Sequence, residues 1–239
     1  VKDVGSTKDY SVSGDGTLVA FATQTIPFGD AAVEVYEYKD SNLTLKVDGQ
    51  IIPPGNGFLI SFLVAFSPAD STTLYMAQGN RIIPIKSNDT AIWPQEAITV
   101  PDINAGQPEN ILGLRVSTDG KWIILQSSSF ALHFYTREGD NVTLNEQVVL
   151  LSLDETEGVS AEAHACFSPD SKYFVVPTTK RVQIEGGGSV TDFEPELLFI
   201  FDLSGSKPVL VFKDLVPNSF GFQNVFSCSF NPTGNGQFV

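Results

Sequence analysis

The sequence is poor in the residues that most often carry chemistry in proteins. Its 239 residues include two cysteines, two histidines, one methionine and two tryptophans. Two cysteines are too few for a disulfide-stapled scaffold, and two histidines are a thin supply for a His-rich metal site. The sequence contains no His-Glu-x-x-His, Cys-x-x-Cys or Gly-x-Ser-x-Gly motif. We therefore predict no catalytic residues, no bound metal and no cofactor.

Basic residues are also scarce, since 14 Lys and Arg face 28 Asp and Glu, for a net charge of −14. This balance argues against binding to nucleic acid or to an anionic membrane surface. No apolar run approaches the roughly 18 residues that a transmembrane helix needs. We predict an acidic protein with no nucleic-acid partner and no membrane insertion.

What the sequence does contain is material for a large β-rich core. Hydrophobic residues make up 42% of the chain, and 18 residues are Phe. The apolar runs are four to eight residues long and are separated by Gly, Pro and polar turns, whereas helical periodicity is hard to find. This pattern predicts an all-β fold.

One stretch, at 164–176, shows how the chain is organised: an apolar strand, the turn Ser168-Pro-Asp-Ser171, and a second apolar strand. Similar turns recur about every 50 residues, a spacing typical of β-propeller blades. The aspartates predicted to share this turn position are Asp15, Asp70, Asp119 and Asp170, with Thr233 in a last copy. The residues predicted to fill one buried slot before the turn are Phe66, Val116, Phe167 and Phe230.

Each unit has a second half with two more β-rich runs, so a unit corresponds to one four-stranded blade. The predicted blades are 9–50, 58–100, 111–153, 162–216 and a partial fifth at 223–239. We predict a single propeller domain over 1–239. Because a fifth unit begins near the end of the sequence, we expect the chain to form part of a larger propeller.

Two motifs resemble the WD-repeat β-propeller superfamily and its WD-like bacterial relatives. They are Phe167-Ser-Pro-Asp before an apolar strand and Phe199-Ile-Phe-Asp-Leu-Ser-Gly205 at a third strand. The sequence has no Gly-His dipeptide, and Phe201-Asp202 stands where the family has Trp-Asp. The resemblance implies a propeller of four-stranded blades, and the wider propeller class also includes lactonases and other hydrolases.

Long connections are the usual place for function on such a scaffold. We interpret 52–57 and 101–108 as solvated connections between blades. The segment 179–196 is predicted to be a long loop within the fourth blade and is our candidate interaction loop. Its acidic residues are Glu185, Asp192, Glu194 and Glu196. It lacks both a phosphate-loop ending and the Asp-x-Asp-x-Asp-Gly core of an EF-hand.

His164 and Cys166 are two residues apart, so on a strand they share a face. They could form a Cys–His nucleophile pair or two metal ligands, but we interpret them as core positions. Cys228 is one residue out of phase with Cys166 when the prolines of the two turns are aligned, which turns its side chain to the opposite face. We therefore expect no Cys166–Cys228 disulfide.

Three Asn-x-Thr sequons fall at the same place, the turn between the third and fourth strands of a blade. Their asparagines are Asn42, Asn88 and Asn141. Asn and Thr suit such a turn for structural reasons alone. These sites would also be N-glycosylated in a secreted protein, and we favour an extracellular location.

The sequence leads to one main functional hypothesis and two rivals. The recurring blade without a reactive constellation favours a non-enzymatic, protein-binding scaffold. The first rival is a propeller hydrolase of lactonase type with a metal in the central channel. The second is a structural or surface-assembly protein, in which copies of the chain associate.

Overall fold

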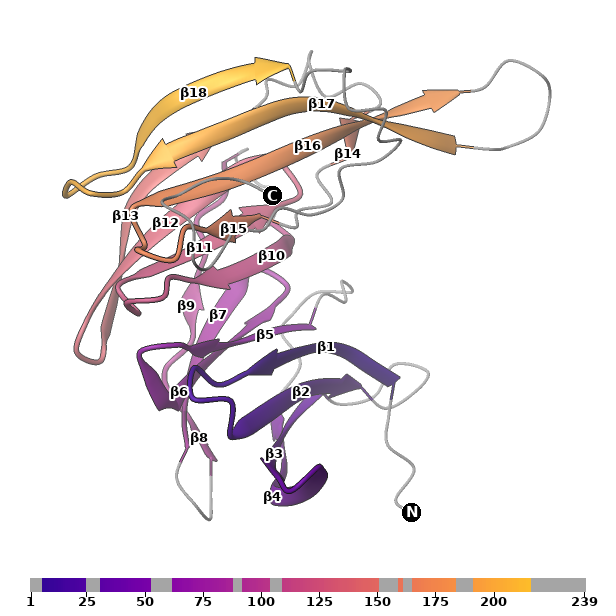
Figure 1. Cartoon of the computed structure of the whole chain (residues 1–239), viewed down its shortest axis with the longest axis vertical. Coiled ribbons are helices and arrows are strands. Elements are labelled where there is room, and N and C mark those ends of the chain that lie inside the picture. The colour runs from indigo at the N-terminus through magenta and orange to yellow at the C-terminus, as the bar shows by residue number, and fades with distance from the viewer. Residues whose placement is uncertain are drawn as a thin grey trace. The chain divides into compact units, whose positions relative to one another are not determined.

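The computed structural model describes residues 6–24, 31–52, 62–87, 92–103, 109–150, 159–160, 165–183 and 191–215 (Figure 1). All regular structure in these ranges is β-strand, so no helix among them could cross a membrane. The strands form four antiparallel sheets in chain order, which is the arrangement of β-propeller blades. The all-β prediction is confirmed.

The first two sheets follow the predicted strand–turn–strand pattern. The first sheet has the order β1 (Ser6–Val12), β2 (Leu18–Gln24), β3 (Ala31–Lys39), β4 (Asn42–Ile52). The second has the order β5 (Phe62–Ser67), β6 (Asp70–Gln78), β7 (Arg81–Ser87), β8 (Ile92–Pro94), and β9 (Ile98–Thr99) also pairs with β7.

The third and fourth sheets repeat this order. The third consists of β10 (Ile111–Val116), β11 (Trp122–Ser127), β12 (Ala131–Glu138) and β13 (Asn141–Val149). The fourth consists of β14 (Val159–Ser160), β16 (Tyr173–Gln183), β17 (Thr191–Asp202) and β18 (Val209–Leu215), and β15 (Cys166–Phe167) pairs with β16. The predicted partial blade at 223–239 lies outside the described residues.

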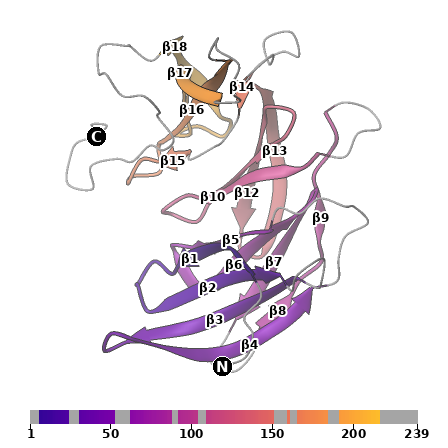
Figure 2. The ribbon, with the colours of Figure 1, turned by 90° about the vertical axis from the view of Figure 1, so that its right-hand side faces the viewer.

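The chain divides into two compact units, 1–123 and 124–239. The first unit holds the first two sheets and β10, and the second holds β12, β13 and the fourth sheet (Figure 2). The single domain over 1–239 stays a prediction.

The position of a strand within its sheet determines its burial. Every residue of β11 is buried, and so is β6 from Thr73 onward, because middle strands are covered on both faces. The last strand of a sheet differs: residues 42–45 of β4 are all exposed, and β13 is largely exposed or half-buried. Buried runs therefore include the middle strands β6 and β11 and also the first strand β5, of which residues 64–67 are buried.

The core of the first unit lies between the first and second sheets. Its buried members are Ala20, Ala22, Val33, Val35, Val64, Phe66, Leu74, Met76, Ile83 and Ile85. The β1–β2 and β5–β6 turns also meet closely. A Cβ on Gly14 would lie 2.9 Å from the carbonyl carbon of Pro68, closer still to its oxygen, so only glycine fits there.

The core of the second unit contains a cluster of aromatic rings that joins β12 to the fourth sheet. Phe134 lies 5.2 Å from Phe201 and 6.3 Å from Phe174 between ring centroids. All three side chains are fully buried. Such tilted and edge-to-face pairs stabilise beyond simple burial of area.

The predicted buried slot before the turn is only partly correct. Phe66 is buried in the core of the first unit. Val116 and Phe167 are half-buried, and Phe230 lies outside the described residues. The ring of Phe167 lies 4.8 Å from that of Phe174 between centroids, but Phe167 belongs to the two-residue edge strand β15 and stays half-buried, whereas Phe174 on β16 is fully buried.

Candidate functional site

The repeated turn is a self-contained hydrogen-bonded structure. In the turn after β1, the Ser13 hydroxyl donates to Asp15 Oδ1 at 2.6 Å and accepts from the Leu18 backbone N–H at 2.9 Å. The Asp15 carboxylate also accepts from Thr17 N–H at 3.1 Å. Gly16 closes the turn at a φ of +72°, a conformation that suits glycine. The serine and the aspartate therefore satisfy the turn's own backbone.

The same network recurs twice. Ser117 donates to Asp119 and accepts from Trp122 N–H, and Ser168 donates to Asp170 and accepts from Tyr173 N–H. The Ser168 hydroxyl lowers the pKa of Asp170, helped by the backbone N–H and side chain of Lys172. Asp15, Asp119 and Asp170 therefore stabilise the turns in which they lie.

Asp70 does not share this turn position, so that prediction is wrong for the second blade. Its turn is shorter, because Ser67 pairs directly with Asp70 across a two-residue loop. The Asp70 carboxylate instead accepts from Thr72 N–H and from the Thr73 hydroxyl, at 2.9 and 2.7 Å. The length of the turn decides where the Asp70 carboxylate lies, and the presence of Pro and Asp in the sequence does not fix that length.

Polar side chains of β1 bind backbone N–H groups of the edge strand β5 within the first unit. Asp9 Oδ2 accepts from Val64 N–H and Ser11 Oγ accepts from Phe66 N–H, both at 2.9 Å. Arg115 on β10 interacts electrostatically with Asp9 and donates to the Leu114 carbonyl at 2.8 Å. Burial raises the pKa of Asp9, while Val64 N–H and Arg115 act in the opposite direction.

Sequence reasoning missed this charged pair. Asp9 lies in a polar first strand, and Arg115 is a lone charge in the otherwise apolar segment Ile111–Val116. A single charge within a buried-strand pattern is the signal that could have marked Arg115 as paired. No sequence signal would have named Asp9 as its partner.

The buried side chains of the third sheet include those of His133 and Tyr135. His133 Nδ1 lies 3.0 Å from Nε2 of Gln147, its partner in the β12–β13 register, so the ring nitrogen accepts from the amide. Burial raises the pKa of Tyr135 to about 12. In the part of the chain that the structure describes, no three His, Cys, Asp or Glu side chains form a metal-binding group.

The candidate interaction loop at 179–196 is mostly a hairpin, which corrects the prediction of a long loop. Residues 179–183 pair with 191–195, with Lys180 opposite Glu194 and Val182 opposite Asp192. Glu196 lies on β17 at the register shift between the Pro177–Leu198 and Thr179–Pro195 pairs. Glu185 lies outside the described residues. Backbone pairing continued past the blade because the β-branched and aromatic residues of both segments suit strands. We call residues 179–196 the arm.

The cysteine prediction is also wrong. Cys166 is disulfide-bonded, and the sequence offers Cys228 as its one other cysteine. The phase argument assumed equal turn lengths in successive blades, and the β5–β6 turn shows that these lengths vary. His164 and Cys228 lie outside the described residues, so the shared-face interpretation stays a prediction.

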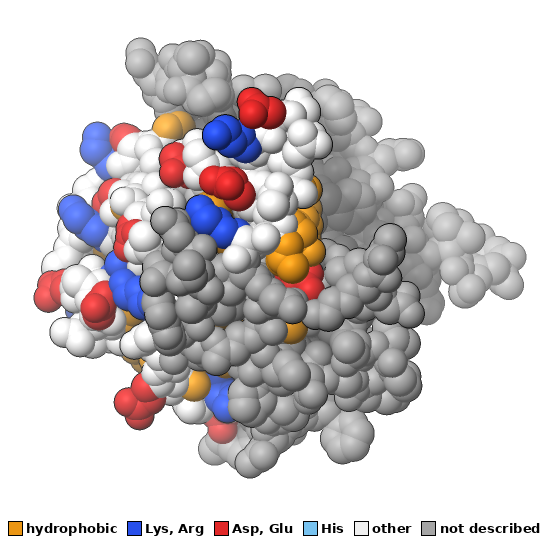
Figure 3. Space-filling model, turned by 90° about the horizontal axis from the view of Figure 1, so that it is seen from below, with side chains coloured by type: hydrophobic (Ala, Val, Ile, Leu, Met, Phe, Trp, Pro, Cys, Tyr) orange, Lys and Arg blue, Asp and Glu red, His pale blue; other side chains and the backbone are white. Residues whose placement is uncertain are grey.

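Two of the three sequons lie at exposed hairpin turns. Asn42 opens β4 and Asn141 opens β13, and both side chains are exposed. Asn88 lies outside the described residues. On the face shown in Figure 3, Lys and Arg side chains are interspersed with Asp and Glu over the described surface, without a continuous basic patch.

Comparisons with solved structures show which fold the chain has. The periplasmic gluconolactonase of Pseudomonas aeruginosa matches 97% of this chain and 68% of its own, at 15% identity and a TM-score of 0.59. A 6-phosphogluconolactonase-like protein of Bacteroides uniformis matches 98% of this chain and 78% of its own, at 14% identity and a TM-score of 0.54. The hydrazine synthase of Kuenenia stuttgartiensis matches 98% of this chain and 73% of its own, at 14% identity and a TM-score of 0.56.

No family model matches the chain, and no curated protein matches it in sequence. At the identities above, the structural likeness concerns the fold alone. The chain therefore belongs to the broad β-propeller class of folds.

Proposed function

We propose that the chain is a non-enzymatic scaffold that binds another protein, built on a WD-like β-propeller over residues 1–239. The observation that carries this proposal is the arm. Beyond Lys180 on β16 and Leu197 on β17, the described residues of the two strands pair with each other and with no other described strand. They run past the rest of their sheet as a two-stranded ribbon (Figure 1).

A two-stranded ribbon without further sheet partners is marginally stable in water by itself. Such an extension contributes little to a blade, but it offers backbone edges with which a partner can pair. The arm contains four acidic residues and two basic residues, Lys180 and Arg181. Its partner surface is accordingly basic, and charge complementarity would speed the encounter.

The experiment compares three forms of the full chain by cross-linking mass spectrometry of complexes isolated from the native source. In the first variant, residues 182–192 are replaced by Asn-Gly, so the ladder closes at the Arg181–Phe193 pair. In the second, the four acids of the arm are changed to Lys. Both variants should lose the copurifying partner, and cross-links in the unaltered protein should include Lys180.

The matched control changes four exposed acids outside the arm to Lys and alters the net charge equally. These residues are Asp40, Glu96, Glu138 and Asp140. This control should retain the partner. Equal binding by all variants would refute the role of the arm, and a chain that binds no protein in its native source would refute the scaffold function.

A second candidate is a propeller hydrolase, and the half-buried Asp9–Arg115 pair favours it because charged groups with shifted pKa values cluster at active sites. The described donor set does not fit a metal centre, since no group of three His, Cys, Asp or Glu side chains is present among those residues. Metal content measured by mass spectrometry on purified protein distinguishes the candidates. A stoichiometric divalent ion would favour the hydrolase.

A surface-assembly function rests on one feature, the exposed apolar edge strand β18. Val209 and Val211 are 57% and 53% exposed, and Leu210 and Phe212 are also exposed. Exposed apolar edges promote association between chains. A protein that stays monomeric at high concentration in size-exclusion chromatography would count against assembly.

A further inference from the structure

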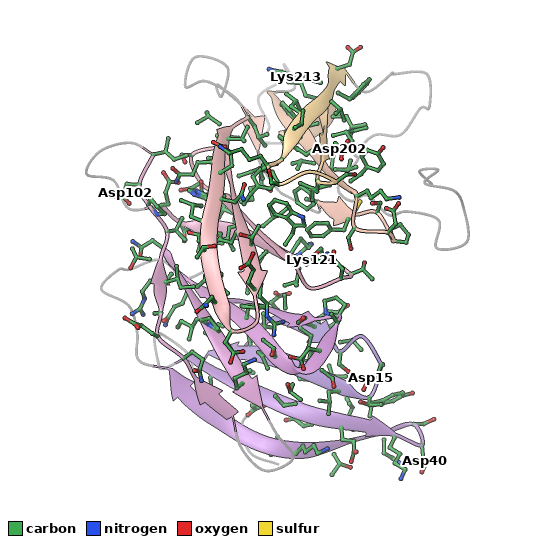
Figure 4. All side chains as sticks on the ribbon, turned by 90° about the vertical axis from the view of Figure 1, so that its left-hand side faces the viewer. Asp15, Asp40, Asp102, Lys121, Asp202 and Lys213 are labelled. Atoms are coloured by element: carbon green, nitrogen blue, oxygen red, sulfur yellow. The ribbon has the colours of Figure 1, made fainter. Side chains whose placement is uncertain are left out.

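The two described sequons lie at the tips of closely similar β-hairpins. In the first, Lys39 pairs with Asn42 around Asp40 and Ser41, whose φ angles are +49° and +63°. Asp40 marks the tip of this hairpin in Figure 4. In the second, Glu138 pairs with Asn141, and Gly139 has a φ of +61°. Both are two-residue turns, so each asparagine begins the edge strand of its sheet.

The acceptor groups are exposed in both hairpins. The asparagine and the threonine of each sequon are two residues apart on one strand, so they share a face, and all four side chains are exposed. Asn42 Nδ2 donates to the Asp40 carbonyl at 3.1 Å. Thr143 Oγ1 lies 3.3 Å from Thr136 Oγ1. These contacts are local and solvated, so each is exchanged for water at little cost.

The equivalent hairpin of the fourth sheet behaves differently. The turn between β17 and β18 packs against β13, where Asn145 Nδ2 donates to the Ser206 carbonyl at 2.9 Å. Lys207 Nζ also lies 2.9 Å from Glu146 Oε2. This turn reads Ser204-Gly-Ser-Lys207 and contains no sequon. The two described sequons therefore lie at exposed hairpin tips, and the described tip that contacts a neighbouring strand has no sequon.

A second, independent observation concerns the compartment. Cys166 is disulfide-bonded, and disulfides form and persist in oxidising compartments such as the endoplasmic reticulum and the extracellular space. Asparagine glycosylation takes place in the same secretory route. The disulfide and the exposed sequons are chemically unrelated, and both indicate the secretory route.

We propose that Asn42 and Asn141 carry N-linked glycans. The donor is a lipid-linked oligosaccharide diphosphate, used by the glycosyltransferase of the secretory pathway. The asparagine Nδ2 forms a bond to the anomeric carbon of the first sugar and loses one proton. The bond between that carbon and the diphosphate oxygen breaks, and the lipid diphosphate leaves.

Glycans at these positions would cover the edge strands that they begin. Leu43 and Leu45 of β4 are 50% and 43% exposed, and Leu144 of β13 is 39% exposed. Unprotected edges of this kind pair with other chains, and bulky polar groups prevent it. The modification thus keeps the edge strands β4 and β13 from pairing with strands of other chains.

The test uses the native protein, isolated on an antibody and digested with an amide-cleaving glycosidase in heavy-oxygen water. The intact mass should fall by the mass of the released glycans, and heavy oxygen should appear at Asn42 and Asn141. The unreduced peptide map should show Cys166 in a disulfide. Unmodified peptides at both asparagines in the native protein would overturn the proposal.

Matched variants of the secreted full chain separate modification from folding. Thr44→Ala should abolish modification at Asn42 alone, whereas Thr44→Ser retains the hydroxyl and should keep it. Thr143→Ala and Thr143→Ser form the same pair for Asn141. Modification that persists in both alanine variants would refute the assignment. Enzymatic removal of the glycans should increase self-association, and unchanged sedimentation would refute the shielding role.

Discussion

The aromatic cluster of the second unit allows a quantitative prediction about how the third and fourth blades hold together. Phe134 is fully buried and contacts the rings of Phe174 and Phe201. Phe134→Ala removes a buried ring, which costs about 3–5 kcal/mol in most cores. At about 2–4 °C per kcal/mol for a chain of this size, Tm should fall by roughly 6–20 °C.

The assay is differential scanning calorimetry with urea unfolding of the same samples. Phe134→Leu keeps most of the volume and should cost less than the alanine variant. Phe212→Ala is the matched control, because that ring is 42% exposed on the edge strand β18 and should cost less than about 1 kcal/mol.

A double-mutant cycle isolates the ring contact itself. Combining Phe134→Ala with Phe201→Ala should reveal a coupling of about 0.5–1.5 kcal/mol, as expected for rings 5.2 Å apart. If Phe134→Ala and Phe212→Ala had the same small effect, or if the coupling were zero, the packing of β12 on the fourth sheet would be refuted.

Three further predictions concern single side chains. Gly14→Ala should cost about 1–3 kcal/mol in chemical unfolding because its Cβ meets the Pro68 backbone, whereas Gly205→Ala, with its nearest atom at 3.7 Å, should be almost neutral. Tyr135→Phe should not destabilise at pH 7, since the hydroxyl is buried without a hydrogen-bond partner among the described residues. Between pH 10 and about pH 12 the Tyr135 phenol keeps its proton in the folded wild type and releases it in the unfolded chain. The free energy of unfolding of the wild type should therefore fall by about 2–3 kcal/mol more than that of Tyr135→Phe over this range. Parallel curves of unfolding free energy against pH for the two proteins would contradict this. Asp170 has a lower pKa in the folded protein than in the unfolded chain, so it stabilises the fold at pH values above its unfolded pKa, and this stabilisation is lost as the pH falls through the folded pKa. In Asp170→Asn the free energy of unfolding should therefore depend less on pH below about pH 4.

Features that depend on neighbouring residues were predictable from the sequence. The strand–turn–strand units, their order and the turns at Ser13, Ser117 and Ser168 follow from bonds between residues at most five positions apart. The sequons were likewise placed correctly at the turns before β4 and β13. Local propensity and turn chemistry are sufficient for such features.

Features that depend on register or on distant contacts were not predictable. The arm was expected to be a loop, because its length and its three glycines hide a ladder that joins residues 179–183 to 191–195. Asp70 was misplaced because β5 and β6 are joined by the two-residue loop 68–69 and Asp70 itself begins β6, whereas Asp15, Asp119 and Asp170 lie within loops between strands.

The sequence by itself determined that this chain is built from repeated four-stranded antiparallel units, since each hairpin forms from residues close together in the chain. Only the tertiary structure brought Asp9 onto the amide of Val64, 55 residues away, and within electrostatic reach of Arg115. Only the tertiary structure paired Cys166. Contacts of this kind arise when separate sheets pack, and packing depends on the volume and burial of many side chains together rather than on any short pattern.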